Sequence, residues 1–213
     1  MNRNLPLPMK KPLKTGLCLV FLTLGHLLSA QNVTLSTNLL DWANVGTANA
    51  EVSIALSQHV SASAAVRFNP WDYGSVENCT AFQNKARTAS LGVRYWPWTS
   101  FSSWWAGARM QVEEYNRGGW IFSTRQNGRR ATEEGVAFGL GFSAGYQYMI
   151  SKHLNIDLGL GLWGGRRIYT RYACPRCGRI LSADDDGHQK VKDVKGWFLL
   201  PSADTQISLV YVF

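Results

Sequence analysis

The sequence predicts an all-β protein, an eight-stranded antiparallel up-and-down transmembrane β-barrel. Three observations lead to this prediction. Large apolar residues alternate with polar residues or glycine in many segments, which is the period of a β-strand. The connections between these segments are short at one end and long at the other. Charged residues gather on the face that lacks the large apolar side chains, so that face does not form an apolar core.

The alternation is clearest at residues 154–162, where every second residue is large and apolar. Residues 136–148 and 207–213 follow the same pattern. After Ala30, no uninterrupted apolar stretch is long enough for a membrane helix. We predict eight strands, at residues 32–40, 47–56, 60–69, 86–96, 103–115, 135–149, 154–170 and 197–213.

The predicted connections have two lengths. Residues 57–59, 97–101 and 151–153 form short turns, and residues 41–46 form one short loop at the other end. The other three loops at that end, 70–85, 116–134 and 171–196, are long and rich in Gly, Asn, Arg and Asp. Outer-membrane barrels have this asymmetry, and both of their termini lie on the periplasmic side. We therefore expect a bacterial outer-membrane location with both termini periplasmic.

The faces of the predicted strands distinguish a membrane barrel from a soluble one. Charges of both signs would be costly in an apolar core, but they can pair across a narrow lumen. The apolar face then contacts lipid, and closure of the sheet satisfies every strand edge. Eight strands leave an interior just filled by side chains, so we expect no open channel. The predicted lumen charge network is Glu51, Arg67, Arg94, Arg109, Glu113, Asp157 and Asp204.

Aromatic residues gather near both ends of the predicted strands. We predict two interface belts, although β-strands are enriched in aromatic residues in any case. One belt contains Trp96, Trp98, Phe101, Trp104, Trp105, Tyr148, Tyr211 and Phe213. The other contains Phe68, Trp71, Tyr73, Tyr115, Trp120, Tyr169 and Trp197. The inward glycines, such as Gly159 and Gly161, are expected to make room for facing side chains.

The N-terminus has the pattern of a secretory signal peptide. A basic segment precedes an apolar run at residues 15–28, and small residues lead to a predicted cleavage site after Ala30. Translation starts at Met1 or at Met9. We therefore predict a signal peptide at 1–30 and one outer-membrane β-barrel domain at 31–213. The signal peptide holds four of the 22 basic residues and no acidic residue, so the remainder has a net charge of +4. We expect no nucleic-acid partner, because no clustered basic face is evident.

Three cysteines follow the predicted cleavage site: Cys79, Cys174 and Cys177. Cys174 and Cys177 are expected to form a small disulfide, because the envelope is an oxidising compartment. A metal site completed by His188 and residues 184–186, or free thiols, are the alternatives. A structural zinc site needs four ligands and no second Cys-x-x-Cys is present. We predict no bound metal and no cofactor.

A lipid-modifying enzyme of the small-barrel type is the alternative function. Such an enzyme needs a nucleophile beside a base. After the predicted cleavage site the histidines are His59, His153 and His188, which fall in two short turns and one long loop. Glu113 and Glu114 have no evident base partner. We therefore expect no catalytic residues.

Several short motifs resemble one known family. They include residues 37–40, 69–71, 94–96 and 145–147, and the Cys-x-x-Cys-Gly at 174–178 is the most specific. Together they resemble a Bacteroidetes family of small outer-membrane proteins of unknown function, DUF3575, over most of residues 33–213. The resemblance implies an outer-membrane location and genes beside those of fimbrillin-type pili. It implies no catalytic residues.

The sequence thus predicts a non-enzymatic outer-membrane barrel that acts through its extracellular loops, in envelope structure or in the biogenesis of fimbria-type surface appendages. The expected partners are outer-membrane lipid, the barrel-insertion machinery and other envelope or appendage proteins. The last group would bind through loops 70–85, 116–134 and 171–196.

Overall fold

The computed structural model describes residues 33–44, 46–73, 82–119, 125–126, 129–130, 132–172, 194–201 and 204–213. The predicted signal peptide lies outside these residues, and its cleavage after Ala30 stays a prediction. Within the described part of the chain, no helix is long and apolar enough to cross a membrane.

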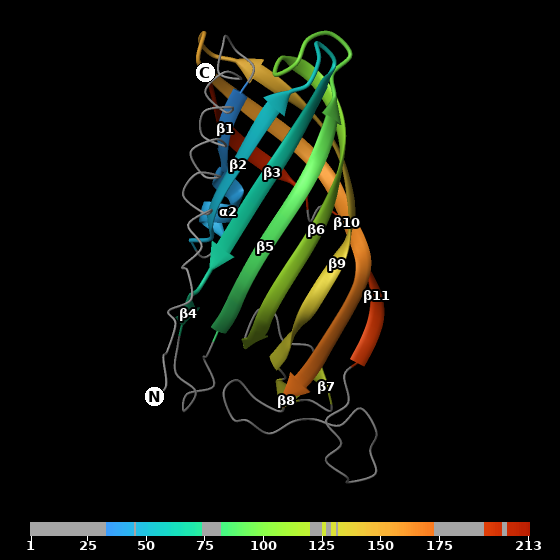
Figure 1. Cartoon of the computed structure of the whole chain (residues 1–213). Helices are drawn as coiled ribbons and strands as arrows, with labels where there is room; N and C mark the ends of the chain where they lie inside the picture. The colour runs from blue at the N-terminus through green and yellow to red at the C-terminus, as the bar shows by residue number, and fades with distance from the viewer. Residues whose placement is uncertain are drawn as a thin grey trace, which may run out of the picture.

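The described residues form twelve β-strands and one short helix (Figure 1). The elements are β1 (Val33–Asn38), α2 (Leu39–Ala43), β2 (Ala48–Ala55), β3 (Val60–Asn69), β4 (Asp72–Tyr73), β5 (Phe82–Tyr95), β6 (Ser103–Gly119), β7 (Arg125–Gln126), β8 (Arg129–Arg130), β9 (Thr132–Met149), β10 (Leu154–Tyr172), β11 (Val194–Pro201) and β12 (Gln206–Val212).

The sheet closes on itself. Antiparallel neighbours follow the order β1, β2, β3, β5, β6, β9, β10 and β12, and β12 pairs back with β1. One edge of β10 is paired with two strands in succession. β12 pairs with residues 154–159 of β10, and β11 pairs with residues 162–169. The predicted all-β, eight-stranded antiparallel barrel is confirmed.

The first strand ends at Asn38, earlier than predicted. The Asn38 side chain caps α2 by accepting a hydrogen bond from the Leu40 N–H at 3.1 Å, and it also accepts one from the Ile207 N–H at 3.1 Å. The Asn49 side chain accepts from the Asn38 N–H at 2.6 Å and donates to the Asn38 carbonyl at 2.9 Å. Side-chain amides thus replace ladder hydrogen bonds where β1 leaves the sheet.

Five strands, β5, β6, β9, β10 and β11, extend beyond their predicted bounds at the long-connection end of the barrel, which is the lower end in Figure 1. The predicted loops 70–85, 116–134 and 171–196 were therefore too wide. Their polar residues suggested loops, but cross-strand ion pairs accompany the pairing there. Arg171 Nε lies 2.8 Å from Glu133 Oε1 on the neighbouring strand.

The last predicted strand, 197–213, is divided into β11 and β12. Asp204 lies at this division and is almost fully buried, with 2% of its surface exposed. Continuous pairing with β10 stops between Gly159 and Leu162. The interruption coincides with the point where a charged side chain enters the interior.

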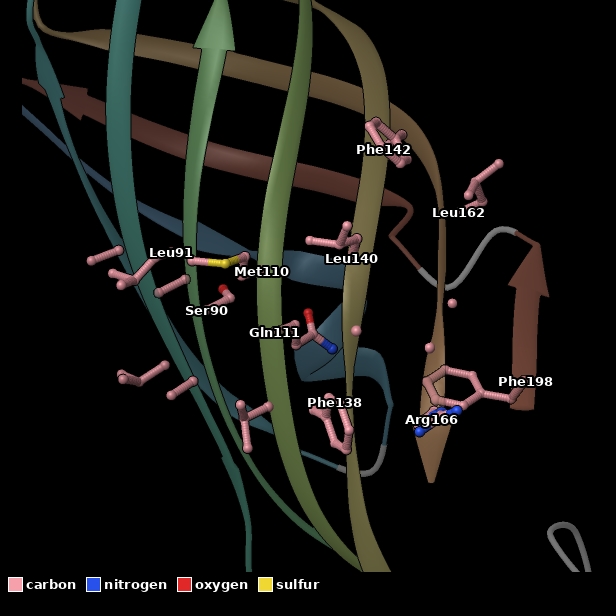
Figure 2. Close-up of a pocket in the computed structure, with 18 of the residues that line it drawn as sticks. Ser90, Leu91, Met110, Gln111, Phe138, Leu140, Phe142, Leu162, Arg166 and Phe198 are labelled. Carbon is pink, nitrogen blue, oxygen red and sulfur yellow. The ribbon is translucent and has the colours of Figure 1, made fainter. Parts of the chain in front are cut away.

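The outer surface of the barrel is apolar. Leu91, Met110 and Leu140 occupy paired positions on β5, β6 and β9, and each is more than half exposed. Figure 2 shows these three side chains along a broad, open groove of about 1240 Å³ on the outside of the wall. Soluble proteins rarely expose so large an apolar patch unless it contacts another molecule.

The predicted aromatic belts need a correction, because several of their members point inward. Trp96, Phe101 and Trp105 are at most 5% exposed and pack together at the short-turn end; we call them the aromatic plug. Tyr115 and Tyr169 are also buried, in a second cluster with Trp163. Among the predicted belt residues whose side chains the structure describes, those on the outside are Phe68, Trp71, Trp98, Trp104, Tyr148, Trp197, Tyr211 and Phe213. The side chains of Tyr73 and Trp120 fall outside the described part.

The aromatic plug depends on inward-facing glycines. A Cβ atom at Gly145 would lie 2.6 Å from Trp105 Cζ2, and one at Gly159 would lie 2.8 Å from the same atom. Both distances are shorter than van der Waals contact. The two glycines on β9 and β10 therefore leave the space that the indole ring of β6 occupies, as predicted for Gly159.

We predict that Gly159→Ala lowers the free energy of unfolding by about 1–3 kcal/mol, because the new methyl group overpacks the plug. Urea unfolding of the refolded protein, followed by tryptophan fluorescence, measures this loss. The matched control is Gly196→Ala, whose Cβ would meet only Arg167 Nε at 4.0 Å. Equal stability of the two variants would contradict this account of the packing.

Candidate functional site in the barrel interior

The most buried charge of the interior is Asp157 on β10, which is 1% exposed. Its carboxylate accepts hydrogen bonds from Arg94 Nη1 at 2.9 Å, Trp105 Nε1 at 2.7 Å and Gln206 Nε2 at 2.7 Å. Arg94 also places Nη2 2.6 Å from Glu51 Oε1, and its guanidinium lies 4.5 Å from the centre of the Trp105 ring. The buried carboxylate is thus both paired and hydrogen-bonded, as burial of a charge requires.

A second group of contacts continues from Gln206. Its Oε1 accepts a hydrogen bond from Arg109 Nη2 at 3.5 Å, and Arg109 Nε lies 3.0 Å from Asp204 Oδ2. The other Asp204 oxygen lies 3.8 Å from Arg67 Nη2, and Arg67 Nε lies 3.0 Å from Asp41 Oδ2. Contacts therefore run without a break through the middle of the barrel.

We call this chain of contacts the interior charge network. It brings together six of the predicted residues: Glu51, Arg67, Arg94, Arg109, Asp157 and Asp204. A void of about 20 Å³ lies beside Glu51, Arg67 and Gln206, which is room for about one water molecule. Side chains therefore fill the middle of the barrel.

Glu113 is placed apart from this network. It forms an ion pair with Arg117, four residues further along β6 toward the long-connection end. Arg117 Nε in turn donates a hydrogen bond to Asn84 Oδ1 at 3.2 Å. The predicted inward direction of Glu113 agrees with its 5% exposure, but its partner is a residue that sequence reasoning missed.

Asp41 was also missed, because it falls in a segment that was predicted to be a short outer loop. Asp41 lies in the first turn of α2, and its carboxylate reaches Arg67. Burial raises the pKa of the Asp41 carboxyl above its ordinary value, and the nearby Arg67 guanidinium opposes that shift. Strand periodicity could not find this residue, because Asp41 is not on a strand.

Toward the long-connection end, the interior widens into a partly enclosed cavity of about 140 Å³, which we call the vestibule. Polar side chains from the α2 turn, β3, β5 and β6 form most of its wall, including Thr88 and Gln111. Trp163 of β10 and Leu200 of β11 form an apolar part. The vestibule is the candidate ligand site of this chain.

The other predicted cysteine, histidine and metal-ligand residues are either outside the described part of the chain, as are Cys79, His188 and residues 184–186, or at the short-turn end. Cys174 and Cys177 lie outside the described residues, so their disulfide stays a prediction. Within the described ranges, no group of three or more His, Cys, Asp and Glu residues is arranged to hold a metal ion. His59 Nδ1 lies 3.0 Å from the Trp96 carbonyl and His153 Nδ1 lies 2.9 Å from the Val212 carbonyl, both at the short-turn end.

Comparison with known proteins gives one match. Residues 16–213 match the sequence model of a family described as "Protein of unknown function (DUF3575)". No curated protein and no solved structure matches the chain.

Because its residues are in contact, mutations in the interior charge network should have non-additive effects on the free energy of unfolding. Arg109→Met removes the nearest cation from buried Asp204, so we expect it to lower the free energy of unfolding by about 3–5 kcal/mol. The double variant Arg109→Met/Asp204→Leu should lose less than the sum of the two single variants, because it leaves neither charge behind. Urea unfolding of all three variants provides the double-mutant cycle, and additive losses would rule out the pairing.

The control for arginine removal is Arg166→Met on the outer face. Its guanidinium lies 4.6 Å from the Trp197 ring centre, and the side chain is exposed. We expect a loss of at most about 1 kcal/mol, the size of an exposed cation–π contact.

Proposed function

The chain belongs to the DUF3575 family, and on this premise we propose that it is a bacterial outer-membrane β-barrel without enzymatic activity. It acts through its long-connection end, in envelope structure or in the biogenesis of fimbria-type surface appendages. In this proposal both termini are periplasmic, and the long connections face outward from the cell.

The apolar outer wall supports the membrane location. Leu160 is 68% exposed and Leu199 is 63% exposed, although both lie on strands that are paired within the sheet. Exposed leucines on a closed barrel suit a hydrocarbon environment, since closure pairs both edges of the eight strands in the ring; among the described strands β11 pairs with β10 alone. The C-terminal Phe213 is also exposed and packs against Tyr211 with ring centres 5.0 Å apart. This surface is available to lipid and to the insertion machinery.

The filled interior supports our proposal that the protein acts at its long-connection end. The aromatic plug fills the short-turn end, and the interior charge network fills the middle. A solute therefore has no open path through these two layers. With passage blocked, the long-connection end is the place where the barrel can meet a partner.

No described contact favours the alternative of a lipid-modifying enzyme. That chemistry requires a nucleophile within hydrogen-bond reach of a base. The two described histidines instead direct Nδ1 to backbone carbonyls in the short turns. A barrel that binds its partners without chemistry agrees better with these contacts.

The test removes the longest connection and keeps the barrel. In one variant an Asn-Gly turn replaces residues 173–193, between the ends of β10 and β11. The control variant replaces Ser151, Lys152 and His153 with glycine and serine at the opposite end. Heat-modifiable migration in gels shows whether each variant has folded.

We expect that a strain lacking the gene has fewer surface appendages in electron micrographs or a higher sensitivity to detergent. The wild type and the control variant should reverse this change, and the shortened variant should not. Full restoration by the shortened variant, or an unchanged deletion strain, would contradict the proposed function.

The lipid-facing wall gives a further prediction. Leu160→Arg should lower the free energy of unfolding from lipid vesicles by about 2–4 kcal/mol, the cost of arginine near a bilayer midplane. The matched control is Leu56→Arg, because Leu56 is 64% exposed but lies in a short turn. If the wall faced water, the two substitutions would have similarly small effects, and the membrane location would be wrong.

A further inference from the structure

The vestibule contains polar groups that lack partners. Gln111 is 7% exposed and Thr88 is 8% exposed, and both line the cavity from the inner faces of β6 and β5. Neither side chain makes a hydrogen bond within the described part of the chain. The indole N–H of Trp163, in the same wall, is also buried without a partner. The indole N–H is thus enclosed without a partner, whereas the polar atoms of Gln111 and Thr88 are open to the cavity and available to a ligand.

The charged groups of the vestibule, in contrast, are already paired. Glu113 pairs with Arg117, and Asp41 pairs with Arg67. An ionic ligand would have to compete with these existing pairs. The uncharged groups left for a ligand are the Gln111 carboxamide, the Thr88 hydroxyl and the Trp163 indole N–H, and the first two can both donate and accept hydrogen bonds. The ligand that fits them is neutral and carries hydroxyl groups.

The apolar part of the vestibule wall favours a ligand that contains a ring. Trp163 and Leu200 form an apolar surface, and an edge-to-face contact with Phe198 holds the indole, with ring centres 4.6 Å apart. The volume of about 140 Å³ is close to that of a cavity of about 150 Å³ that accommodates benzene. Because the vestibule is only partly enclosed, one six-membered ring can enter it while part of its substituents stays outside.

We propose that the vestibule binds one neutral pyranose residue of a glycan. The C–H face of the sugar ring would lie on Trp163 and Leu200, and its hydroxyl groups would bond to Gln111 and Thr88. This inference goes beyond the proposed function and does not depend on it, because sugar binding is a property of the purified barrel.

The experiment titrates sugars against the full mature protein, refolded in lauryldimethylamine oxide, a detergent without a sugar headgroup. The probes are the methyl glycosides of glucose, mannose and galactose, with glucuronate and glucosamine as charged counterparts. Saturation-transfer NMR detects the bound sugar. We expect at least one neutral glycoside to bind more tightly than either charged sugar. Absence of binding, or a preference for a charged sugar, would overturn the proposal.

Variants locate the bound sugar. Gln111→Leu keeps the side-chain size and removes the carboxamide, so affinity should fall about tenfold, the effect of about one lost hydrogen bond. The matched control is Gln147→Leu, a glutamine that is 2% exposed at the opposite end of the interior, and it should bind like the wild type. Thr88→Val provides a second, nearly isosteric test if Gln111→Leu does not fold. Wild-type affinity in the folded vestibule variants would place the sugar elsewhere.

A second titration separates the two sources of such a sugar. It compares a lipid-free core oligosaccharide with the intact lipopolysaccharide from which it was released. Binding of both assigns recognition to the sugar, as we propose. Binding of the intact glycolipid alone would overturn the proposal, because the lipid would then be the recognised part.

Discussion

The buried carboxylate of Asp157 needs hydrogen-bond donors, and this need determines how the side chains of the interior are arranged. Its three donors come from Arg94 on β5, Trp105 on β6 and Gln206 on β12. Satisfying a single charge on β10 therefore aligns three other strands across the lumen. Removing a buried carboxylate from water is costly unless such partners are present. The register of the barrel and the placement of its glycines follow from the space that these side chains need.

A polar, filled interior and an apolar exterior are two results of the same alternation. Along β10, the inward positions carry Asp157, Gly159 and Trp163, while Leu158 and Leu160 point outward. The two ends of the interior then differ in kind. The short-turn end is closed by packed aromatic rings, and the long-connection end keeps a cavity with polar walls. This difference is why we assign partner binding to the long-connection end.

Much of the fold could be predicted from residue periodicity, because a barrel strand has one face for each environment. The same alternation is incompatible with part of the predicted aromatic belts. Trp104 and Trp105 are consecutive on β6, so only one of them can point outward, and Trp105 is the buried one. The alternation along strands does not apply to Phe101, because Phe101 lies in a turn with a positive φ of 64°. Its side chain reaches the aromatic plug from there.

The candidate site was less predictable than the fold, because it depends on cross-strand register. The sequence identified the inward charges, but the partner of each charge is decided by which strand positions face each other. Glu113 pairs with Arg117 on its own strand, and Asp41 reaches Arg67 from a helix. The vestibule wall joins residues as distant in sequence as Thr88 and Leu200. No local pattern connects these positions before the barrel has closed.

We propose that the interior is closed to solutes and that the barrel acts at its long-connection end. Ion conductance of the purified protein in a planar lipid bilayer measures this closure. We expect no steady conductance from the wild type, and discrete channels from the triple variant Arg94→Ala/Trp105→Ala/Asp157→Ala, in which the plug and the network are both opened. Steady channels in the wild type would show that the interior is open.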